Sequence, residues 1–358
     1  MKLLYITNGI HGAGGLERVL SIKASYLSDY MDYEVHVLTL NYANEPLFYT
    51  FSPKIKLHSI TVKGNPLRYS VAYVSGIRSV VKRIQPDVIS VCDDGLKGFF
   101  VPTLLQCTIP VIYERHASIA FNTTKIIYGK IIRFFMQKLA ATFDCFVVLT
   151  ASNVLEWNTK NVQVIPNPLT FYPMERSQLQ QKTVIAVGSH SHNKGYDLLL
   201  EAWTIVGSKY PDWQLHIYGT IDKDSVYVNL AKKLDVHNTV TFHNPVADIQ
   251  KKYLKASVMV MSSRSEGFGM VLIEAMACGL PCVSFDCPSG PRDIITDGED
   301  GFLIEKENPI ALSKRLILLM QDKALRVKMG VSAKENVKRF QAENILPKWD
   351  QLFKELAQ

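Results

Sequence analysis

Two carboxylates flank a glycine-rich loop in the second half of the chain. Glu266 stands in a polar loop that follows the apolar run 258–261 and precedes a helical segment over 269–277. A strand, a glycine loop and a helix in this order direct backbone N–H groups and the positive end of a helix toward phosphate. Gly267 and Gly269 allow the backbone to approach a ligand closely, because neither has a Cβ. The segment therefore predicts a phosphate-binding site.

Glu274 is the charged residue of this otherwise apolar helix. A buried carboxylate needs hydrogen-bond donors. Because helical side chains lean toward the N-terminus, Glu274 is expected to point toward the phosphate end, near Met270 and Val271. There its two oxygens match a pair of hydroxyls such as a ribose 2′,3′-diol. A structural salt bridge to an arginine or lysine elsewhere in the fold is the alternative interpretation.

The elements that must position these groups alternate between strands and helices. Strand patterns cover 3–7, 34–40, 55–62, 87–91, 111–113 and 145–149, with helix patterns such as 16–27 and 71–84 between them. The alternation breaks at Pro166-Asn167-Pro168 and restarts with strand patterns over 183–187, 214–218, 240–242, 258–261 and 282–285. This order predicts an α/β fold of two doubly wound, Rossmann-like domains with parallel sheets.

The domain boundaries follow from the same pattern. We expect one domain over 1–167, a second over 168–340, and a C-terminal helix over 341–358 that returns to the first domain. Ligands of such sheets bind beyond the carboxyl ends of the strands, so two facing sheets predict an interdomain cleft. No apolar run approaches the ~20 residues that span a bilayer. The first residues are interpreted as a strand, because their apolar stretch is short for a signal peptide and no cleavage site follows.

The charge is unevenly distributed along the chain. The net charge is +7, and residues 1–167 hold 17 Lys and Arg against 11 Asp and Glu, whereas residues 168–358 hold 23 against 22. This excess of positive charge is compatible with binding to nucleic acid or to an anionic membrane, and also with a mildly basic surface exposed to solvent. Segment 124–142 mixes Lys125, Lys130, Arg133 and Lys138 with isoleucine and phenylalanine. This mixture fits either a helix lying on an anionic membrane or a helix buried on one side.

The cysteines predict neither a disulfide scaffold nor a metal site. Six cysteines are few for a disulfide-rich protein of 358 residues, and no CxxC pair occurs. Cys278, Cys282 and Cys287 lie close in sequence, but their spacing fits no common zinc pattern. We interpret them as buried or inert thiols of a reducing compartment.

The stretch 265–283 as a whole resembles the E-x7-E signature of the retaining GT-B glycosyltransferases of family 4, with Glu266 and Glu274 as its two glutamates. The stretch 289–298 and the run Gly14-Gly15-Leu16-Glu17-Arg18 resemble the same family. The resemblance implies the GT-B architecture. It also implies retaining transfer of a hexose or N-acetylhexosamine from a nucleotide-diphosphate sugar, most commonly a UDP-sugar, to a saccharide acceptor.

The resemblance also implies roles for individual residues. Glu274 would hold the nucleotide ribose, Glu266 would lie by the transferred sugar, and Lys194 would bind the diphosphate. His116 matches the active-site histidine of the family, which makes it and Glu266 the candidate catalytic residues. Taken alone, Lys194 fits a solvated lysine and His116 a structural histidine. The remaining donor-binding positions are Gly14, Gly15, Asn244 in the base-binding loop, Gly267, Phe268, Gly269, Met270 and Val271.

One position departs from the family pattern. The family usually carries an arginine five residues before the diphosphate lysine, and this chain has Ser189 there. A hydroxyl does not replace a fork-shaped cation. Either His190, His192 or Arg264 substitutes for it, or the donor is held less tightly.

The resemblance implies no cofactor, because the nucleotide sugar is a substrate, and no bound metal. No DxD-type motif suited to a phosphate-bound Mg²⁺ is found, and Asp93-Asp94 is interpreted as a loop or acceptor-side feature. The expected partners are the sugar donor and a saccharide acceptor, with no nucleic acid. Relatives often extend lipid-linked saccharides in bacterial surface polysaccharide assembly. We therefore expect a cytoplasmic enzyme with a lipid-linked acceptor and peripheral contact with the inner face of the membrane.

Three other functions remain open on the sequence. A nicotinamide-dinucleotide dehydrogenase is suggested by Gly12-Ala13-Gly14, but Glu17 stands where the third glycine of the fingerprint belongs. A sugar-nucleotide epimerase shares the two-domain architecture and needs no acceptor. A degenerate sugar-nucleotide-binding module is motivated by Ser189.

Overall fold

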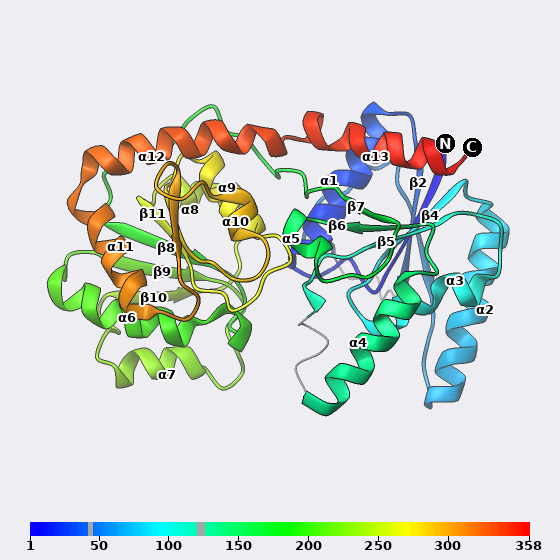
Figure 1. Ribbon diagram of the computed structural model, residues 1–358, viewed down its shortest axis with the longest axis horizontal. Helices are drawn as coiled ribbons and strands as arrows, with labels where there is room; N and C mark the ends of the chain where they lie inside the picture. The colour runs from blue at the N-terminus through cyan, green and yellow to red at the C-terminus, as the bar shows by residue number, and fades with distance from the viewer. Residues whose placement is uncertain (42–45, 120–125) are drawn as a thin grey trace. The chain divides into compact units, whose positions relative to one another are not determined.

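The computed structural model describes residues 1–41, 46–119 and 126–358, with the backbone alone for residues 126 and 127. The chain forms two compact units (Figure 1). The N-terminal unit comprises Met1–Pro168 together with Ala342–Gln358, and the C-terminal unit comprises Leu169–Gln341. These boundaries lie one residue beyond positions 167 and 340, where the sequence pattern changes.

The N-terminal unit is built on a parallel sheet. Among the described residues its strand order is β3-β2-β1-β4-β5-β6-β7. The strands are β1 (Lys2–Thr7), β2 (Glu34–Leu40), β3 (Lys56–Ile60), β4 (Val88–Cys92), β5 (Val111–Glu114), β6 (Cys145–Val148) and β7 (Val162–Val164). The helices are α1 (Gly15–Tyr30), α2 (Pro66–Ile84), α3 (Val101–Leu105), α4 (Ile126–Ala140), α5 (Ala151–Val154) and α13 (Ala342–Leu356), with a 3₁₀ turn, η1 (Leu96–Phe100).

The C-terminal unit repeats the order of the first six of these strands, without a counterpart of β7 among the described residues. Its order is β10-β9-β8-β11-β12-β13, and its strand pairs are also parallel. The strands are β8 (Thr183–Val187), β9 (Gln214–Tyr218), β10 (Val240–His243), β11 (Val258–Met261), β12 (Cys282–Phe285) and β13 (Gly301–Ile304). The helices are α6 (Tyr196–Lys209), α7 (Val226–Lys233), α8 (Gln250–Tyr253), α9 (Met270–Ala277), α10 (Pro291–Ile294), α11 (Pro309–Gln321) and α12 (Lys323–Asn336), with 3₁₀ turns η3 (His192–Lys194) and η4 (Val337–Phe340).

In both sheets, the direction in which successive strands are added reverses at a defined point. This point lies between β1 and β4 in one unit and between β8 and β11 in the other. In an open parallel sheet, the loops at the carboxyl ends of such a strand pair form the ligand-binding crevice. The four loops that follow these strands are therefore the ones expected to carry chemistry. The predicted α/β class and the two doubly wound sheets are confirmed.

Each sheet is covered by apolar side chains of its own unit. Continuous burial along β4 and β11 is typical of parallel strands that have helices on both faces. In the C-terminal unit, Leu199 and Trp203 of α6 pack with Leu312 and Leu316 of α11 in one core cluster. Such cores hold the strand ends, and thus the loops that follow them, in fixed positions.

The helix α13 belongs to the N-terminal unit, although it is the last element of the chain. It packs against α1. Tyr33, in the turn after α1, also contacts it, because the Tyr33 hydroxyl donates to Asp350 Oδ1 over 2.7 Å and its ring lies 6.1 Å from that of Phe353. In Figure 1 it is the red helix beside α1. No helix of the described residues is long and apolar enough to cross a bilayer.

Two short strands were missing from the sequence-based assignment. β7 is a three-residue edge strand with two exposed side chains, and β13 begins at Gly301. β7 lacks the apolar run of a buried strand, so its pairing with β6 depends on the finished sheet. β13 does carry a short apolar and mostly buried run, 302–304, which pairs with β12. All six cysteines are free thiols. Five are buried as expected, whereas Cys107 is exposed.

Candidate active site

The loop between β11 and α9 is held in place by backbone packing. Gly269 has φ +105° and caps α9, a conformation that side chains disfavour. A Cβ on Gly290 would lie 2.1 Å from the carbonyl oxygen of Phe268. The Ser289 hydroxyl donates to the Glu266 carbonyl over 2.7 Å. The second family-like stretch, 289–298, thus supports the first one directly.

The loop between β8 and α6 lies against the same segment. Ser262 Oγ donates to the Lys194 carbonyl over 2.9 Å, and Asn193 Nδ2 donates to the Ser265 carbonyl over 2.8 Å. A Cβ on Gly195 would lie 2.1 Å from the Ser262 carbonyl oxygen. The two loops therefore form one packed surface at the switch point of the sheet.

Lys194 and Glu266 meet on this surface. Their Nζ and Oε1 atoms are 2.6 Å apart, and their side chains are 21% and 12% exposed. The pair is thus sheltered but open to solvent. A cation next to a carboxylate, beside the N-terminus of α9, can bind an anionic group if the ligand exchanges with the carboxylate.

Glu274 is completely buried on α9, with no exposed surface. Thr170 Oγ1 donates to its Oε1 over 3.1 Å, and Tyr253 OH donates to its Oε2 over 3.4 Å. Each carboxylate oxygen thus accepts a hydroxyl, which is also the chemistry that a sugar diol offers. The role of Glu274 toward ribose stays a prediction.

The backbone positions of the predicted donor site differ in exposure. Phe268 is 3% exposed and its ring packs edge-on against Phe340, so its side chain belongs to the core. Gly267, Met270 and Val271 are partly exposed at the start of α9. Helix N-termini present N–H groups that lack intrahelical acceptors. These positions can therefore bind through their backbone.

Arg264 and His190 do not fill the place of the absent arginine. Arg264 forms a two-pronged ion pair with Asp197, with distances of 2.9 and 2.6 Å. His190 is enclosed by aromatic rings, and burial lowers its imidazole pKa, which favours the neutral form. His192 is exposed beside Lys194. The role of Lys194 toward a diphosphate stays a prediction.

Asn244 lies at the carboxyl end of β10 and is exposed. The preceding His243 stacks on Tyr218 at a ring separation of 4.4 Å, and its Nε2 lies 2.8 Å from His216 Nδ1. These contacts hold the strand end below Asn244. Gly219 N also donates to the His243 carbonyl over 2.9 Å, which joins this loop to the end of β9.

In the N-terminal unit, Gly14 and Gly15 start α1 after β1. A Cβ on Gly14 would lie 2.4 Å from Glu17 Oε2, whereas Gly15 faces open space. The Glu17 carboxylate thus lies over the loop at the positive end of α1. A carboxylate there accepts hydroxyls and repels phosphate, so this loop suits the sugar part of a ligand better than its diphosphate.

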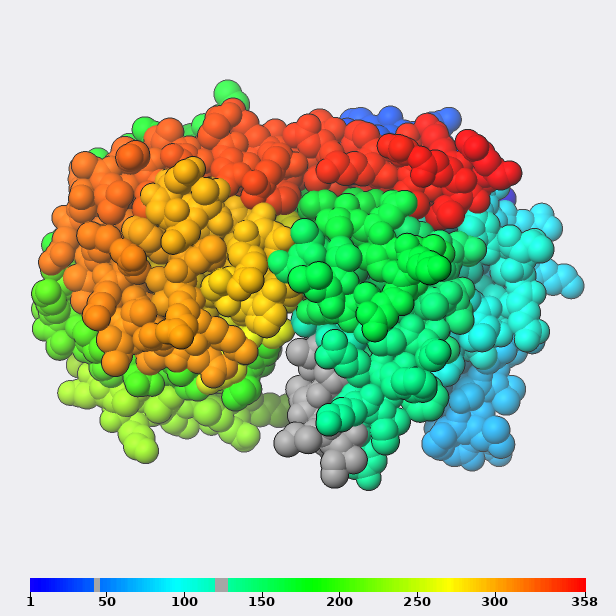
Figure 2. Space-filling model, viewed as in Figure 1, coloured from blue at the N-terminus to red at the C-terminus, as the bar shows by residue number. Residues whose placement is uncertain are grey.

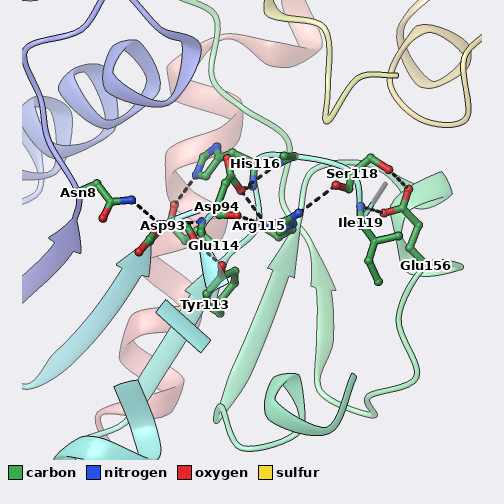
Figure 3. A network of polar contacts seen from close by, with 12 residues as sticks. Asn8, Asp93, Asp94, Tyr113, Glu114, Arg115, His116, Ser118, Ile119 and Glu156 are labelled. Atoms are coloured by element: carbon green, nitrogen blue, oxygen red, sulfur yellow. Dashed lines mark hydrogen bonds and ion pairs between the residues drawn. The ribbon is translucent and has the colours of Figure 1, made fainter. Parts of the chain in front are cut away.

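His116 follows β5, and its backbone is held by the neighbouring β4 loop (Figure 3). Asp94 Oδ1 accepts hydrogen bonds from the backbone N–H groups of His116 and Ala117, each over 3.0 Å. Arg115 donates to the carbonyls of Asp94 and Ser118, each over 2.9 Å. Asp94, interpreted from sequence as a loop or acceptor-side feature, is a positioning residue here.

Asp93 joins the loops at the switch point of this unit. Its Oδ1 accepts from Asn8 Nδ2 over 2.6 Å and from Gly95 N over 2.7 Å. Asn8 follows β1 and Asp93 follows β4, so the bond crosses between adjacent strand ends. Burial raises the pKa of Asp93 above its ordinary value. Figure 3 shows both residues beside the His116 segment.

The His116 side chain contacts a buried carboxylate. Its Nε2 lies 3.3 Å from Glu114 Oε2, and Glu114 also forms an ion pair with Lys23 of α1. Ligand atoms of Cys92, Glu114 and His116 lie within 4.8 Å of one another, which raises the question of a metal. The Lys23 ammonium already neutralises Glu114, and burial raises the thiol pKa of Cys92. The donor set therefore fits an ion pair better than a cation site.

The predicted residues thus fall into two groups. Lys194, Glu266 and the start of α9 meet at the carboxyl edge of one sheet, with Asn244 at the end of its edge strand. Gly14, Gly15 and His116 follow β1 and β5 at the carboxyl edge of the other sheet. The expected cleft between the two units stays a prediction.

Sequence reasoning missed Lys23 and Glu156, and it assigned Asp94 to the loop without its positioning role. Glu156 accepts from Ser118 Oγ and Ile119 N, each over 2.8 Å, and so fixes the chain beyond His116. Lys23 could have been noticed, because it stands on the stripe of α1 that holds Leu20 and Leu27. A lysine on a buried stripe indicates a buried acidic partner.

Comparisons with known proteins show the family to which the chain belongs. Residues 13–170 match the family described as Glycosyltransferase Family 4, and residues 173–336 match Glycosyl transferases group 1. An uncharacterized glycosyltransferase of Haemophilus influenzae is 32% identical over 97% of this chain and 98% of its own length. The chain belongs to the GT-B glycosyltransferases.

Other relatives of this glycosyltransferase extend the comparison. The amylovoran biosynthesis glycosyltransferase AmsD of Erwinia amylovora is 28% identical over 98% of this chain and 99% of its own. The solved structure of Anabaena HepE in complex with UDP and glucose has a TM-score of 0.80 at 17% identity, covering 99% of both chains. The glycosyltransferase is therefore related to enzymes of surface polysaccharide biosynthesis, and the family does not favour the dehydrogenase or epimerase alternatives.

Proposed function

We propose that this glycosyltransferase moves a hexose or N-acetylhexosamine, with retention of configuration, from a nucleotide-diphosphate sugar to a saccharide acceptor. UDP is the proposed nucleotide, because it is the common one in the group that the E-x7-E stretch resembles. The observation that carries the proposal is the pair of glutamates on one loop and helix. Glu266 meets a cation at the surface, and Glu274 is buried with hydroxyl donors as partners.

Donor binding starts at Glu274. We assign to it the two hydroxyls of the ribose, which take over the hydrogen bonds now donated by Thr170 and Tyr253. Because Glu274 is fully buried, Thr170 has to withdraw when the ribose enters. Because the ribose hydroxyls take the place of the protein hydroxyls, the buried carboxylate of Glu274 always has hydrogen-bond donors.

The diphosphate then lies by Lys194 and the N-terminus of α9. Lys194 exchanges its contact with Glu266 for the diphosphate oxygens, and Glu266 becomes free to accept hydroxyls of the transferred sugar. Met270 and Val271 supply backbone N–H groups. The negative charge that develops on the leaving diphosphate is stabilised by this cation and helix end, which we propose suffice without a metal or cofactor.

We assign the acceptor saccharide to the N-terminal unit. Gly15 faces open space, and the Glu17 carboxylate beside it accepts sugar hydroxyls. His116 follows the end of β5 with its imidazole mostly buried. These groups are the acceptor-side counterparts of Lys194 and Glu266.

A panel of nucleotide sugars tests the reaction. We expect a UDP-sugar to raise the melting temperature and to be consumed with an oligosaccharide acceptor, giving a product with the anomeric configuration of the donor by NMR. Glu274→Gln should weaken nucleotide binding at least tenfold, whereas Glu201→Gln, an exposed site on α6, should not. Binding of the sugar nucleotide without transfer or hydrolysis would instead indicate the degenerate module that Ser189 suggests. Inversion of configuration would refute the retaining mechanism.

We further propose that the acceptor is lipid-linked and that α4 contacts an anionic membrane at the inner face. Tyr128, Ile131, Phe134 and Phe135 of α4 are 69%, 52%, 59% and 57% exposed, whereas Met136 is buried. Lys130, Arg133 and Lys138 are exposed beside them, and Figure 2 shows α4 at the surface of the N-terminal unit. An apolar face of this kind with cations at its margin is typical of interfacial helices. Lys125 of the same segment lies outside the described residues.

Vesicle sedimentation tests the membrane contact. Binding to phosphatidylglycerol vesicles should fall at least tenfold for Lys130→Glu with Arg133→Glu, and binding to phosphatidylcholine vesicles should be weak throughout. Lys232→Glu with Lys233→Glu on α7 makes the same charge change elsewhere and should leave binding unaltered. If the α4 variant binds as wild type does, the membrane proposal is wrong.

A further inference from the structure

Lys23 is a fully buried lysine on α1. Its side chain and that of Glu114 are each 1% exposed, and the two form an ion pair. The ammonium also lies 3.9 Å from the ring centroid of Trp349 on α13 and 5.1 Å from that of Tyr5 on β1. Two aromatic faces and one carboxylate thus surround the charge.

Both oxygens of Glu114 are engaged. Ser90 Oγ donates to Oε1 over 2.5 Å, while Lys23 and His116 Nε2 approach Oε2. Burial raises the pKa of Glu114, but the Lys23 ammonium and the bond from His116 outweigh burial and hold it below its ordinary value. Glu114 is therefore an ionised carboxylate, which accepts hydrogen bonds and cannot donate them.

This chemistry determines the tautomer of His116. Because Glu114 only accepts, Nε2 must carry the hydrogen, and in the neutral ring Nδ1 then has a free lone pair. Nδ1 is buried and has no hydrogen-bond partner. A buried acceptor without a partner is uncommon in proteins and indicates a group that a ligand completes.

We propose that Lys23 and Glu114 are positioning residues that orient His116 with Nδ1 as an open acceptor for a hydroxyl of the sugar donor or the acceptor saccharide. The inference rests on the proposed function for its substrate class. Lys23 keeps the carboxylate ionised. Glu114 in turn holds the ring by its Nε2–H, while Asp94 holds the backbone of the same residue. Burying the Lys23–Glu114 charge pair costs free energy, and in return the lone pair of Nδ1 has a fixed direction.

Lys23 determines the protonation state of Glu114 in this proposal. Without Lys23 the buried carboxylate has no counter-charge and takes up a proton. A protonated Glu114 donates to Nε2, and the ring then carries its hydrogen on Nδ1. Lys23→Met should therefore reverse the tautomer without touching His116, and Lys23→Met with Glu114→Leu should leave both tautomers populated.

Nitrogen NMR of ¹⁵N-histidine-labelled protein reads the tautomer directly, with His116→Gln used to assign the signals. Wild type should show a protonated Nε2 and an unprotonated Nδ1. Leu352→Ala on α13 is the matched control, because it removes buried apolar contacts of the same unit and should leave the tautomer unaltered. A protonated Nδ1 in wild type, or a Lys23→Met variant with the wild-type tautomer, overturns the inference.

Kinetics separate positioning from a merely structural role. Lys23→Met with Glu114→Leu should lower kcat about tenfold, with a smaller effect on KM, in the wild-type background. The same double change should have no further effect on His116→Ala, because the group that it orients is gone. An equal loss in both backgrounds overturns the inference. If wild type turns over no sugar nucleotide, the proposed function fails, while the NMR outcome still decides the positioning of His116.

Discussion

The two units bring a lysine and a glutamate together at the same end of the same sheet topology, but in opposite surroundings. Lys194 and Glu266 are 21% and 12% exposed, whereas Lys23 and Glu114 are 1% exposed. A buried pair cannot release one partner without leaving a charge in a nonpolar environment. A sheltered but accessible pair can exchange a partner for a ligand at little cost. One pair therefore suits binding, and the other suits permanent positioning.

The loops around the two lysine–glutamate pairs also differ in how they are supported and in what they leave accessible. Around Lys194 and Glu266, support comes from glycines and carbonyls that leave the side chains accessible, as at Gly195 and Gly290. Around His116, support comes from carboxylates, Asp94 and Glu156, that bind backbone N–H groups. The first unit thus holds a side chain in one orientation, and the second exposes backbone and charge to a ligand.

The largest expected effect is the loss of stability on breaking the buried pair. Lys23→Met should lower the free energy of unfolding by about 3–5 kcal/mol, because Glu114 loses its counter-charge and has to take up a proton to stay buried. Adding Glu114→Leu should recover most of the loss. Chemical denaturation measures both. A double variant as unstable as the single one would contradict the contrast between the two pairs.

Breaking the accessible pair should instead affect activity. Lys194→Met should lower kcat about 100-fold, since it removes the cation that faces the leaving diphosphate. The free energy of unfolding should change by less than about 1 kcal/mol. Lys182→Met, at an exposed lysine paired with Asp212 in the same unit, is the control and should leave kcat unaltered. Unimpaired turnover by Lys194→Met would show that another group binds the diphosphate.

The glycine support of the accessible site can be tested separately. Gly290→Ala should cost about 1–3 kcal/mol in stability, because its Cβ would overlap the Phe268 carbonyl. Gly298 has a similar positive φ of +80° but open space around it, so Gly298→Ala isolates the backbone strain. Thermal unfolding of the two variants compares the contributions. Equal losses would mean that the contact with Phe268 is unimportant.

Acid should weaken the buried pair selectively. The pKa of Glu114 is lowered in the folded protein from 4.5 to about 2, so its contribution to stability is present above pH 4.5 and is lost as the pH falls toward 2. Stability of wild type should therefore decline across this window more steeply than that of the Lys23→Met, Glu114→Leu variant. Parallel declines would indicate that Glu114 is not ionised in the folded state.

A further expected effect concerns the aromatic face beneath Lys23. Trp349→Leu keeps an apolar residue but removes the ring that lies 3.9 Å from the ammonium. We expect a loss of about 2 kcal/mol, part of it from cation–π attraction. Combined with Lys23→Met, the loss from Trp349→Leu should shrink, and a double-mutant cycle measures the difference.

Most of the fold could be predicted from local patterns. The strands β2, β8, β9, β11 and β12 occupy the residues that the sequence predicted. β8, β11 and β12 are short, mainly apolar runs, whereas β2 and β9 alternate apolar and polar residues. The helix α2 begins earlier than predicted. Asn65 accepts from Arg68 N over 3.0 Å and Pro66 starts the helix, a combination of capping signals that extends it beyond its apolar stripe.

The candidate site also has one part that the sequence predicted and one part that it did not. Lys194, Glu266 and Glu274 were recognisable because their motif is contiguous and has a defined spacing. Glu114 stands in the same short segment as His116, yet its function depends on Lys23, which is 91 residues away in sequence. No local pattern connects these two residues.

The amino-acid order by itself determined the alternating elements, the two parallel sheets and the glycine loop that carries the glutamate motif, because these depend on residues within one turn or one strand of each other. Only the tertiary structure decided which charges are paired and how deeply each pair is buried. Pairs such as Lys23 with Glu114, and Arg264 with Asp197, form where packed elements bring distant segments into contact. Burial then determines whether a charged group holds its neighbour in place or remains accessible to a ligand.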